Sequence, residues 1–169
     1  MRQKEGENSK RKEVRAKCME DILIYEERKE WTLLAIYCAN EDGLSPAQLQ
    51  KSLFLLGKNL PDAVGDNYYQ FTPYGYGPFD QTIYFDAEQL SRDGLISINY
   101  TESRKWPKYF ITSKGKEHGE KSLKQKTTKE VIAYLTAVIK WAQSLTFQEL
   151  IRAIYHAFPK FKRNSVFQE

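Results

Sequence analysis

Residues able to carry nucleophilic or metal chemistry are few and scattered in this chain. The two histidines, His118 and His156, lie far from each other and from cysteine or carboxylate partners at a recognisable ligand spacing. Cys38 lies in the apolar stretch WTLLAIYCA, where we expect a buried reduced thiol, and Cys18 ends a basic segment. The sequence has no nucleophile elbow, Walker loop, HExxH or paired acidic motif. We therefore expect a protein that is not an enzyme and uses no metal or cofactor.

Aromatic residues are concentrated in YYQFTPYGYGPF, residues 68–79. Such a run could stack on bases or bind an extended peptide, and it could also be the packing seam between a strand and two helices. Tyr74 and Tyr76, together with Phe85 shortly after the run, are the candidate residues for binding a protein partner.

Positive charge is concentrated at the N-terminus. The net charge is +4, and residues 1–17 alone hold seven Lys/Arg and three Glu, so the rest of the chain balances at zero. We expect residues 1–25 to be a basic, flexible tail in which Arg11 and Lys12 could contact phosphates. The tail has no secretory signal and the chain no apolar stretch of about 18 residues, so we expect a cytoplasmic protein without a membrane span.

Capping signals and apolar spacing predict the elements that position these residues. Ser45 with Gln48, and Thr146 with Glu149, are capping-box pairs that begin helices, and Gly57 would end the first of these two. Helices are predicted over 27–39, 45–56, 79–93, 128–143 and 146–158, a short helix after 113, and strands near 69–73, over 96–100 and over 109–112.

The predicted order of elements is that of a winged helix-turn-helix: a helix, a capped helix, a third helix, and then two strands joined by a loop. In this motif the third helix usually enters the major groove. We predict a mainly helical α+β fold with a winged-helix core. Residues 26–126 would form this domain, with an inserted aromatic loop and strand over 59–78. The C-terminal helices over 127–169 would pack on the core or form a dimer interface. About twenty inserted residues leave the pose of the third helix open.

Two resemblances support this fold. The run YFITSKGKEHGEK resembles the end of the second wing strand in bacterial winged-helix regulators of the MarR and PadR kind. The segments LSPAQLQKSLFLL, YQFTPYGYGPF and QLSRDGLI resemble the pattern of the Panacea antitoxin domain and of YwgA-type bacterial proteins, as does the ending LTFQELIRAIYHAFPKFKRNSVF. The matching positions are Leu49, Gln50, Lys51, Phe54, Tyr76, Gly77, Pro78, Leu90, Gly94, Leu95 and Ile96.

These resemblances cover roughly 44–119 and 145–167. They imply a winged-helix-like fold with a regulatory or toxin-neutralising role in bacteria or prophages, and no catalysis.

The predicted third helix and wing differ in charge. The helix carries four acidic residues against Arg92 alone, a balance of −3, which does not suit a position between phosphate ribbons. The wing is basic, with Trp106 at its tip.

Two hypotheses follow. In the first, a bacterial or prophage regulator binds double-stranded DNA through its wing, its basic tail and part of the third helix, and the C-terminal helices could join two copies in a homodimer. In the second, an antitoxin-like or adaptor protein holds a protein partner, such as a toxin, against the acidic helix and the aromatic segment. The candidate DNA contacts are Arg104, Lys105, Trp106 and Lys108 in the wing, Gln81, Thr82, Gln89 and Arg92 in the third helix, and Arg11 and Lys12 in the tail.

Overall fold

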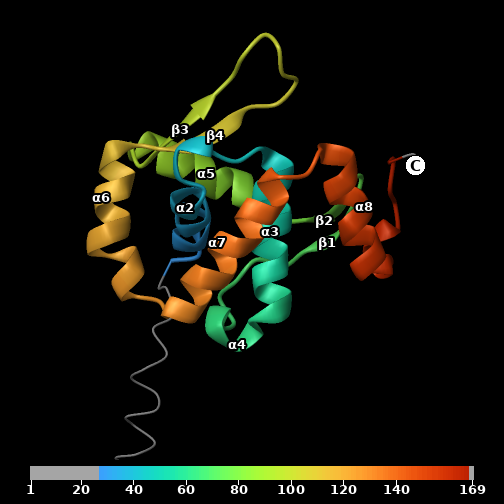
Figure 1. Cartoon of the computed structure of the whole chain (residues 1–169), viewed down its shortest axis with the longest axis horizontal. Coiled ribbons are helices and arrows are strands. Elements are labelled where there is room, and N and C mark those ends of the chain that lie inside the picture. Colours follow the sequence, from blue (N-terminus) through green and yellow to red (C-terminus); the bar gives the residue numbers. More distant parts are fainter. Residues whose placement is uncertain (1–26, 168–169) are drawn as a thin grey trace, which may run out of the picture.

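A computed structural model of the chain describes residues 27–167 (Figure 1). The fold is mainly helical α+β with two small antiparallel hairpins, which confirms the predicted class. The elements are α2 (Lys29–Cys38), η1 (Asn40–Asp42), α3 (Pro46–Asn59), α4 (Pro61–Val64), β1 (Thr72–Tyr74), β2 (Gly77–Phe79), α5 (Thr82–Arg92), β3 (Ile96–Asn99), β4 (Lys108–Ile111), α6 (Ser113–Lys121), η2 (Leu123–Gln125), α7 (Lys129–Gln143), α8 (Phe147–Ala157) and η3 (Pro159–Lys162). The predicted tail over 1–25, with Arg11, Lys12 and Cys18, lies outside the described residues.

Helix α2 is the centre of the core. All six residues from Trp31 to Ile36 are buried, and the helix contacts α3, α5, α6, α7 and β4. Figure 1 shows these elements arranged around it. A helix surrounded in this way is largely apolar on every face, as WTLLAI is, and its one polar side chain, Thr32, is hydrogen-bonded to the Tyr69 hydroxyl at 2.6 Å. Helix α2 therefore holds the other elements in fixed relative positions.

Helix α3 begins at the predicted capping box. The Ser45 hydroxyl accepts from the Gln48 N–H at 3.2 Å, and the Gln48 side chain accepts from the Ser45 N–H at 2.9 Å. The prediction that α3 ends at Gly57 was wrong, because the helix continues to Asn59. A Cβ at Gly57 would lie 2.6 Å from Cε1 of Tyr68, so the glycine permits close approach of that ring.

The aromatic run forms a hairpin that the sequence did not predict in full. Strands β1 and β2 pair antiparallel, with Pro73 opposite Pro78. Gly77, Pro78 and Phe79 therefore form a strand, and the start of the helix predicted over 79–93 was wrong by three residues. Helix α5 begins at Thr82, where the Asp80 carboxylate accepts from the Thr82 N–H at 2.9 Å and from its hydroxyl at 2.6 Å.

The second hairpin lies where the wing was predicted. Strands β3 and β4 pair with Ile96 opposite Ile111, and the segment 100–107 between them projects from the body (Figure 1). Leu44, between α2 and α3, adds a bridge to this hairpin. Its N–H and C=O bond the C=O and N–H of Tyr109 at 2.9 and 2.8 Å.

The C-terminal helices pack on the rest of the chain. Helix α7 contacts α2 and α3 through a buried face that includes Val131, Leu135 and Ile139. Helix α8 closes a second cluster around Phe54, whose ring lies edge-on to Phe71, Phe158 and Phe161. No helix between residues 27 and 167 is both long enough and apolar enough to cross a membrane.

Candidate functional site

A pocket of about 250 Å³ opens beneath the segment 100–107, which lies where the wing was predicted and which we call the wing loop. It lies among the first turns of α3, the β1–β2 hairpin and the start of α8, which Figure 1 shows together on one side of the molecule. Its surface is mainly apolar because aromatic side chains make up most of the wall. The six ring-bearing residues are Tyr74, Tyr76, Phe79, Tyr84, Trp106 and Phe147.

Ring contacts hold the wall together across elements distant in sequence. Tyr74 stacks on Phe79 at 4.9 Å between centroids, within the hairpin. Phe147, at the start of α8, contacts Tyr76 at 5.1 Å and Trp106 at 5.8 Å. Trp106, which the sequence places at the tip of the predicted wing, leans towards α8 and forms one edge of the pocket.

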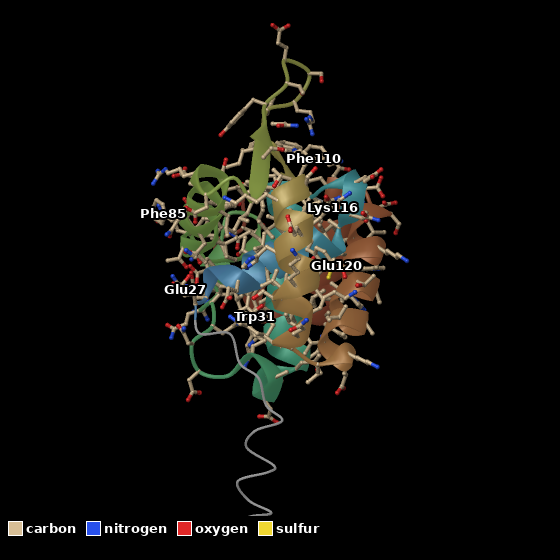
Figure 2. All side chains as sticks on the ribbon, turned by 90° about the vertical axis from the view of Figure 1, so that its left-hand side faces the viewer. Glu27, Trp31, Phe85, Phe110, Lys116 and Glu120 are labelled. Atoms are coloured by element: carbon tan, nitrogen blue, oxygen red, sulfur yellow. The ribbon has the colours of Figure 1, made fainter. Side chains whose placement is uncertain are left out.

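The rim of the pocket exposes large aromatic area. Tyr74, Tyr76 and Trp106 are 62%, 47% and 43% exposed, and we call these three residues the aromatic rim. Phe85 is also exposed, but it lies on the outer side of α5 and does not line the pocket (Figure 2). Of the three residues predicted to bind a partner, two therefore belong to the pocket and one lies apart from it.

A lysine lines the pocket from within. Lys51 of α3 is only 4% exposed, and its ammonium donates to the Pro78 carbonyl oxygen at 3.2 Å. Burial lowers the pKa of Lys51 to about 8. Beside it, the Gln50 amide donates to the Asp80 carbonyl at 2.9 Å and accepts from the Asp80 N–H at 3.1 Å. Gln50 and Lys51 thus fix the turn that follows β2.

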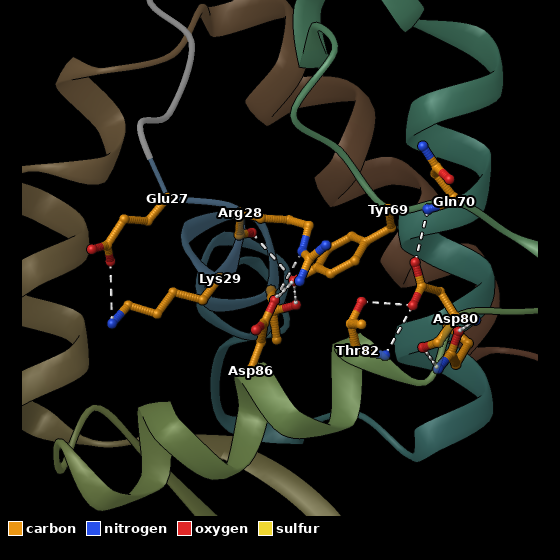
Figure 3. A network of polar contacts seen from close by, with 10 residues as sticks. Glu27, Arg28, Lys29, Tyr69, Gln70, Asp80, Thr82 and Asp86 are labelled. Carbon is orange, nitrogen blue, oxygen red and sulfur yellow. Dashed lines mark hydrogen bonds and ion pairs between the residues drawn. The ribbon is translucent and has the colours of Figure 1, made fainter.

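The acidic residues of the third helix are engaged within the fold. Asp86 accepts a hydrogen bond from the Tyr69 hydroxyl at 2.6 Å and pairs with Arg28 at 3.5 Å (Figure 3). Burial and the Asp86 carboxylate raise the pKa of Tyr69, so its phenol remains a donor. The Asp80 carboxylate accepts from the Thr82 N–H at the start of α5, and the Asp93 carboxylate lies 3.8 Å from the Lys29 ammonium. The net charge of −3 counted from the sequence of this helix is therefore more negative than the charge that its surface presents.

The predicted base-reading residues fall into two groups. Gln81, Gln89 and Arg92 are exposed, with Arg92 at 3.7 Å from Glu88. Thr82 is different, because its N–H and hydroxyl both donate to Asp80. It is held as part of the helix start and is poorly placed to contact a base.

The wing cations are partly held by their own loop. Arg104 donates to the Thr101 hydroxyl at 3.0 Å, Lys108 lies 5.6 Å from the Phe110 ring centre, and Lys105 is exposed. Residues 80–112, from the start of α5 through the wing, hold four basic and five acidic side chains. Residues 113–129 hold six basic and two acidic ones. The more basic segment is therefore 113–129, which follows β4 directly and contains none of the predicted DNA contacts.

Several residues that line the pocket were not predicted as site residues. Gln50 and Lys51 were named only as positions that match the resemblance, while Tyr84 and Phe147 were not singled out. The available signal was the buried run of α3, since Lys51 follows Leu49 and precedes Leu53 on a helix with few exposed positions.

Metal-binding groups are not assembled in the described part of the chain. Between residues 27 and 167, no three His, Cys, Asp or Glu side chains lie close enough together to hold a metal ion. The pocket and its buried lysine are therefore the site that the geometry distinguishes. The sequence matches no protein family model and no curated protein, so the site must be interpreted from its own chemistry.

Proposed function

We propose that this chain is a non-enzymatic module that binds a protein partner, as an antitoxin or an adaptor does, on a winged-helix scaffold. The observation that carries the proposal is the aromatic rim around an apolar pocket. Exposed aromatic residues beside a concave apolar site are typical of the energetic centre of protein interfaces.

The order of the elements supports the winged-helix scaffold. Helices α2, α3 and α5 precede the β3–β4 hairpin, and Leu44 pairs with β4 from its place between the first two helices. The segment over 60–81 departs from the usual motif, since it inserts α4 and the β1–β2 hairpin between the second and third helices. This insertion supplies Tyr74 and Tyr76, so the extra segment contributes to the proposed binding surface.

Charge favours a protein partner over DNA at this face. A protein that binds duplex DNA neutralises phosphates with Lys and Arg, yet residues 80–112 carry a net charge of −1. The surface of the described chain is instead aromatic where the wing meets α8.

Affinity purification from the native host, with the genomic neighbours present, tests the proposal. The tagged full chain should retain a stoichiometric partner, and Tyr74→Ala with Tyr76→Ala should lose it. Tyr100→Ala is the matched control, because Tyr100 is 77% exposed but does not line the pocket. If no stoichiometric partner is retained, or if the rim and control variants retain it equally, the proposal fails. An adjacent toxin gene would favour the antitoxin form.

DNA binding is the second candidate function, with Arg104, Lys105 and Lys108 as the observation that favours it. The acidic residues Asp80 and Asp86 are engaged internally, so the outer face of α5 presents a less negative surface than its composition indicates. Electrophoretic shifts on duplex DNA at low salt would test this function. Binding that is lost on charge reversal of the three wing cations would support it, and binding unaffected by that change would exclude the wing.

A further inference from the structure

The pocket beneath the wing combines aromatic walls with one buried cation. We infer that it binds the last residue of a partner polypeptide, with a large apolar side chain among the rings and the terminal carboxylate on Lys51. This inference rests on the proposed function and adds the chemistry by which the partner would be recognised. Capture of a chain-terminal carboxylate is one of the recurring modes of peptide recognition.

The apolar part of the ligand follows from the walls. Tyr74, Tyr76, Trp106 and Phe147 surround the opening, and contacts through Phe147 connect the hairpin, the wing and α8. An aromatic or large aliphatic side chain inserted here would exchange water for ring contacts on several sides.

The anionic part follows from Lys51. Among the residues that line the pocket, Lys51 is the one charged side chain, and none is a carboxylate. Its ammonium can donate three hydrogen bonds. Within residues 27–167 it donates one, to the Pro78 carbonyl oxygen. A buried ammonium without an opposite charge is costly, and its lowered pKa reflects that cost. A ligand carboxylate would supply both the charge and the missing acceptors.

The size of the pocket favours a chain end over an internal acidic residue. At about 250 Å³ it lies below the roughly 300–1,000 Å³ typical of small-molecule sites, so it suits one anchoring residue. A chain-terminal residue carries its apolar side chain and its carboxylate on the same Cα. An internal segment would need two side chains, and a main chain entering and leaving, in the same space.

Short peptides with matched ends test this inference directly. The probe is an acetylated Gly-Ser-Gly-Ser-Phe peptide with a free C-terminal carboxylate, titrated against the full chain by calorimetry. The matched controls are the same peptide as its C-terminal amide, and an amide-ended peptide carrying an internal Glu-Phe pair. We expect the free acid to bind at least about tenfold more tightly than either control.

Variants of α3 provide the second arm. Lys51→Met should bring the acid and the amide to equal affinity, while Lys58→Met, an exposed lysine on the same helix, should keep the difference. Because Lys51 also bonds Pro78, each variant is first checked for the native thermal transition. If Lys51→Met does not fold, Trp106→Ala should weaken the acid peptide, since that side chain forms the pocket edge.

Three results would overturn the inference. They are equal affinity for acid and amide, tighter binding of the internal Glu-Phe peptide, and no binding of the acid peptide at millimolar concentration. Each is separable from failure of the proposed function. If Tyr76→Ala loses the host partner while any of these three results is found, the protein-binding function is supported and only recognition of a chain-terminal carboxylate is contradicted.

Discussion

A single buried lysine should make a measurable contribution to how the stability of this protein changes with pH. Lys51 has a pKa of about 8 in the fold, whereas an exposed lysine in the unfolded chain remains protonated to its usual value of 10.5. Between these values the unfolded state binds more protons, so raising the pH stabilises the fold. We expect Lys51 to contribute a rise of about 2 kcal/mol in the unfolding free energy from about pH 8 to about pH 9.5.

Urea unfolding of the wild type and of Lys51→Met across this range would measure the effect. The variant should lack the contribution of Lys51, since methionine does not titrate. Burial raises the pKa of Cys38 and of Tyr69 in the fold, so both groups oppose the trend as pH rises, but they do so equally in the two proteins. If the unfolding free energies of the wild type and of Lys51→Met changed with pH in parallel, Lys51 would not be the cause of the rise.

Two acidic residues on α5 should differ in their contribution to stability. Asp86 is mostly buried and holds Tyr69 and Arg28, while Glu88 is exposed and lies 3.7 Å from Arg92. Asp86→Asn should lower the free energy of unfolding by about 1–3 kcal/mol, because a charged, buried acceptor is lost. Glu88→Gln should change it by less than about 0.5 kcal/mol. Chemical denaturation compares them, and equal losses would show that the Asp86 contacts are not stabilising.

Helix α6 depends on a glycine that lets it lie against the start of β3. A Cβ at Gly115 would overlap the main-chain oxygen of Leu95, which cannot rotate away as a side chain would. Gly115→Ala should therefore lower the thermal midpoint despite the better helix propensity of alanine, with a loss of about 1–3 kcal/mol. Gly75→Ala is the control, because its Cβ would lie 3.4 Å from Val166. A Gly115→Ala protein as stable as the wild type would mean that the helix can move aside.

Elements with local signals were predictable, and those that depend on packing were not. The capping boxes at Ser45 and Thr146 mark true helix starts because the capping atoms lie within one turn. Gly57 looked like a helix end, but its role comes from the Tyr68 ring, which lies outside the helix. The pair Gly77-Pro78 is compatible with a helix start, and only pairing with β1 makes it a strand.

At the scale of the whole molecule, the pocket could be anticipated only in part. The aromatic run and the wing tryptophan were predicted as candidate contact residues, and the structure places Tyr74, Tyr76 and Trp106 on one rim. The sequence could not indicate that Phe147 joins them or that Lys51 lies inside the pocket. Those contacts depend on the packing of α8 beside α3, for which the sequence carries no local signal.

The wing should be coupled to the C-terminal helices through one ring contact. Trp106 and Phe147 lie 5.8 Å apart and join a projecting loop to α8, although 40 positions separate them in the chain. Phe147→Ala should release the loop, so we expect faster hydrogen exchange over residues 100–107 with a loss of global stability of about 1 kcal/mol or less. The core around Trp31 should be unaffected, because Phe147 does not belong to that cluster.

Hydrogen exchange with mass spectrometry would follow both regions in one experiment. Trp141→Ala serves as the control, since Trp141 is an exposed ring on α7 that does not line the pocket. Unchanged exchange in the wing loop of Phe147→Ala would mean that other contacts hold the loop. Faster exchange there would show that the Phe147 ring holds the wing loop against α8, and a rim ordered in this way loses less conformational entropy when a partner binds.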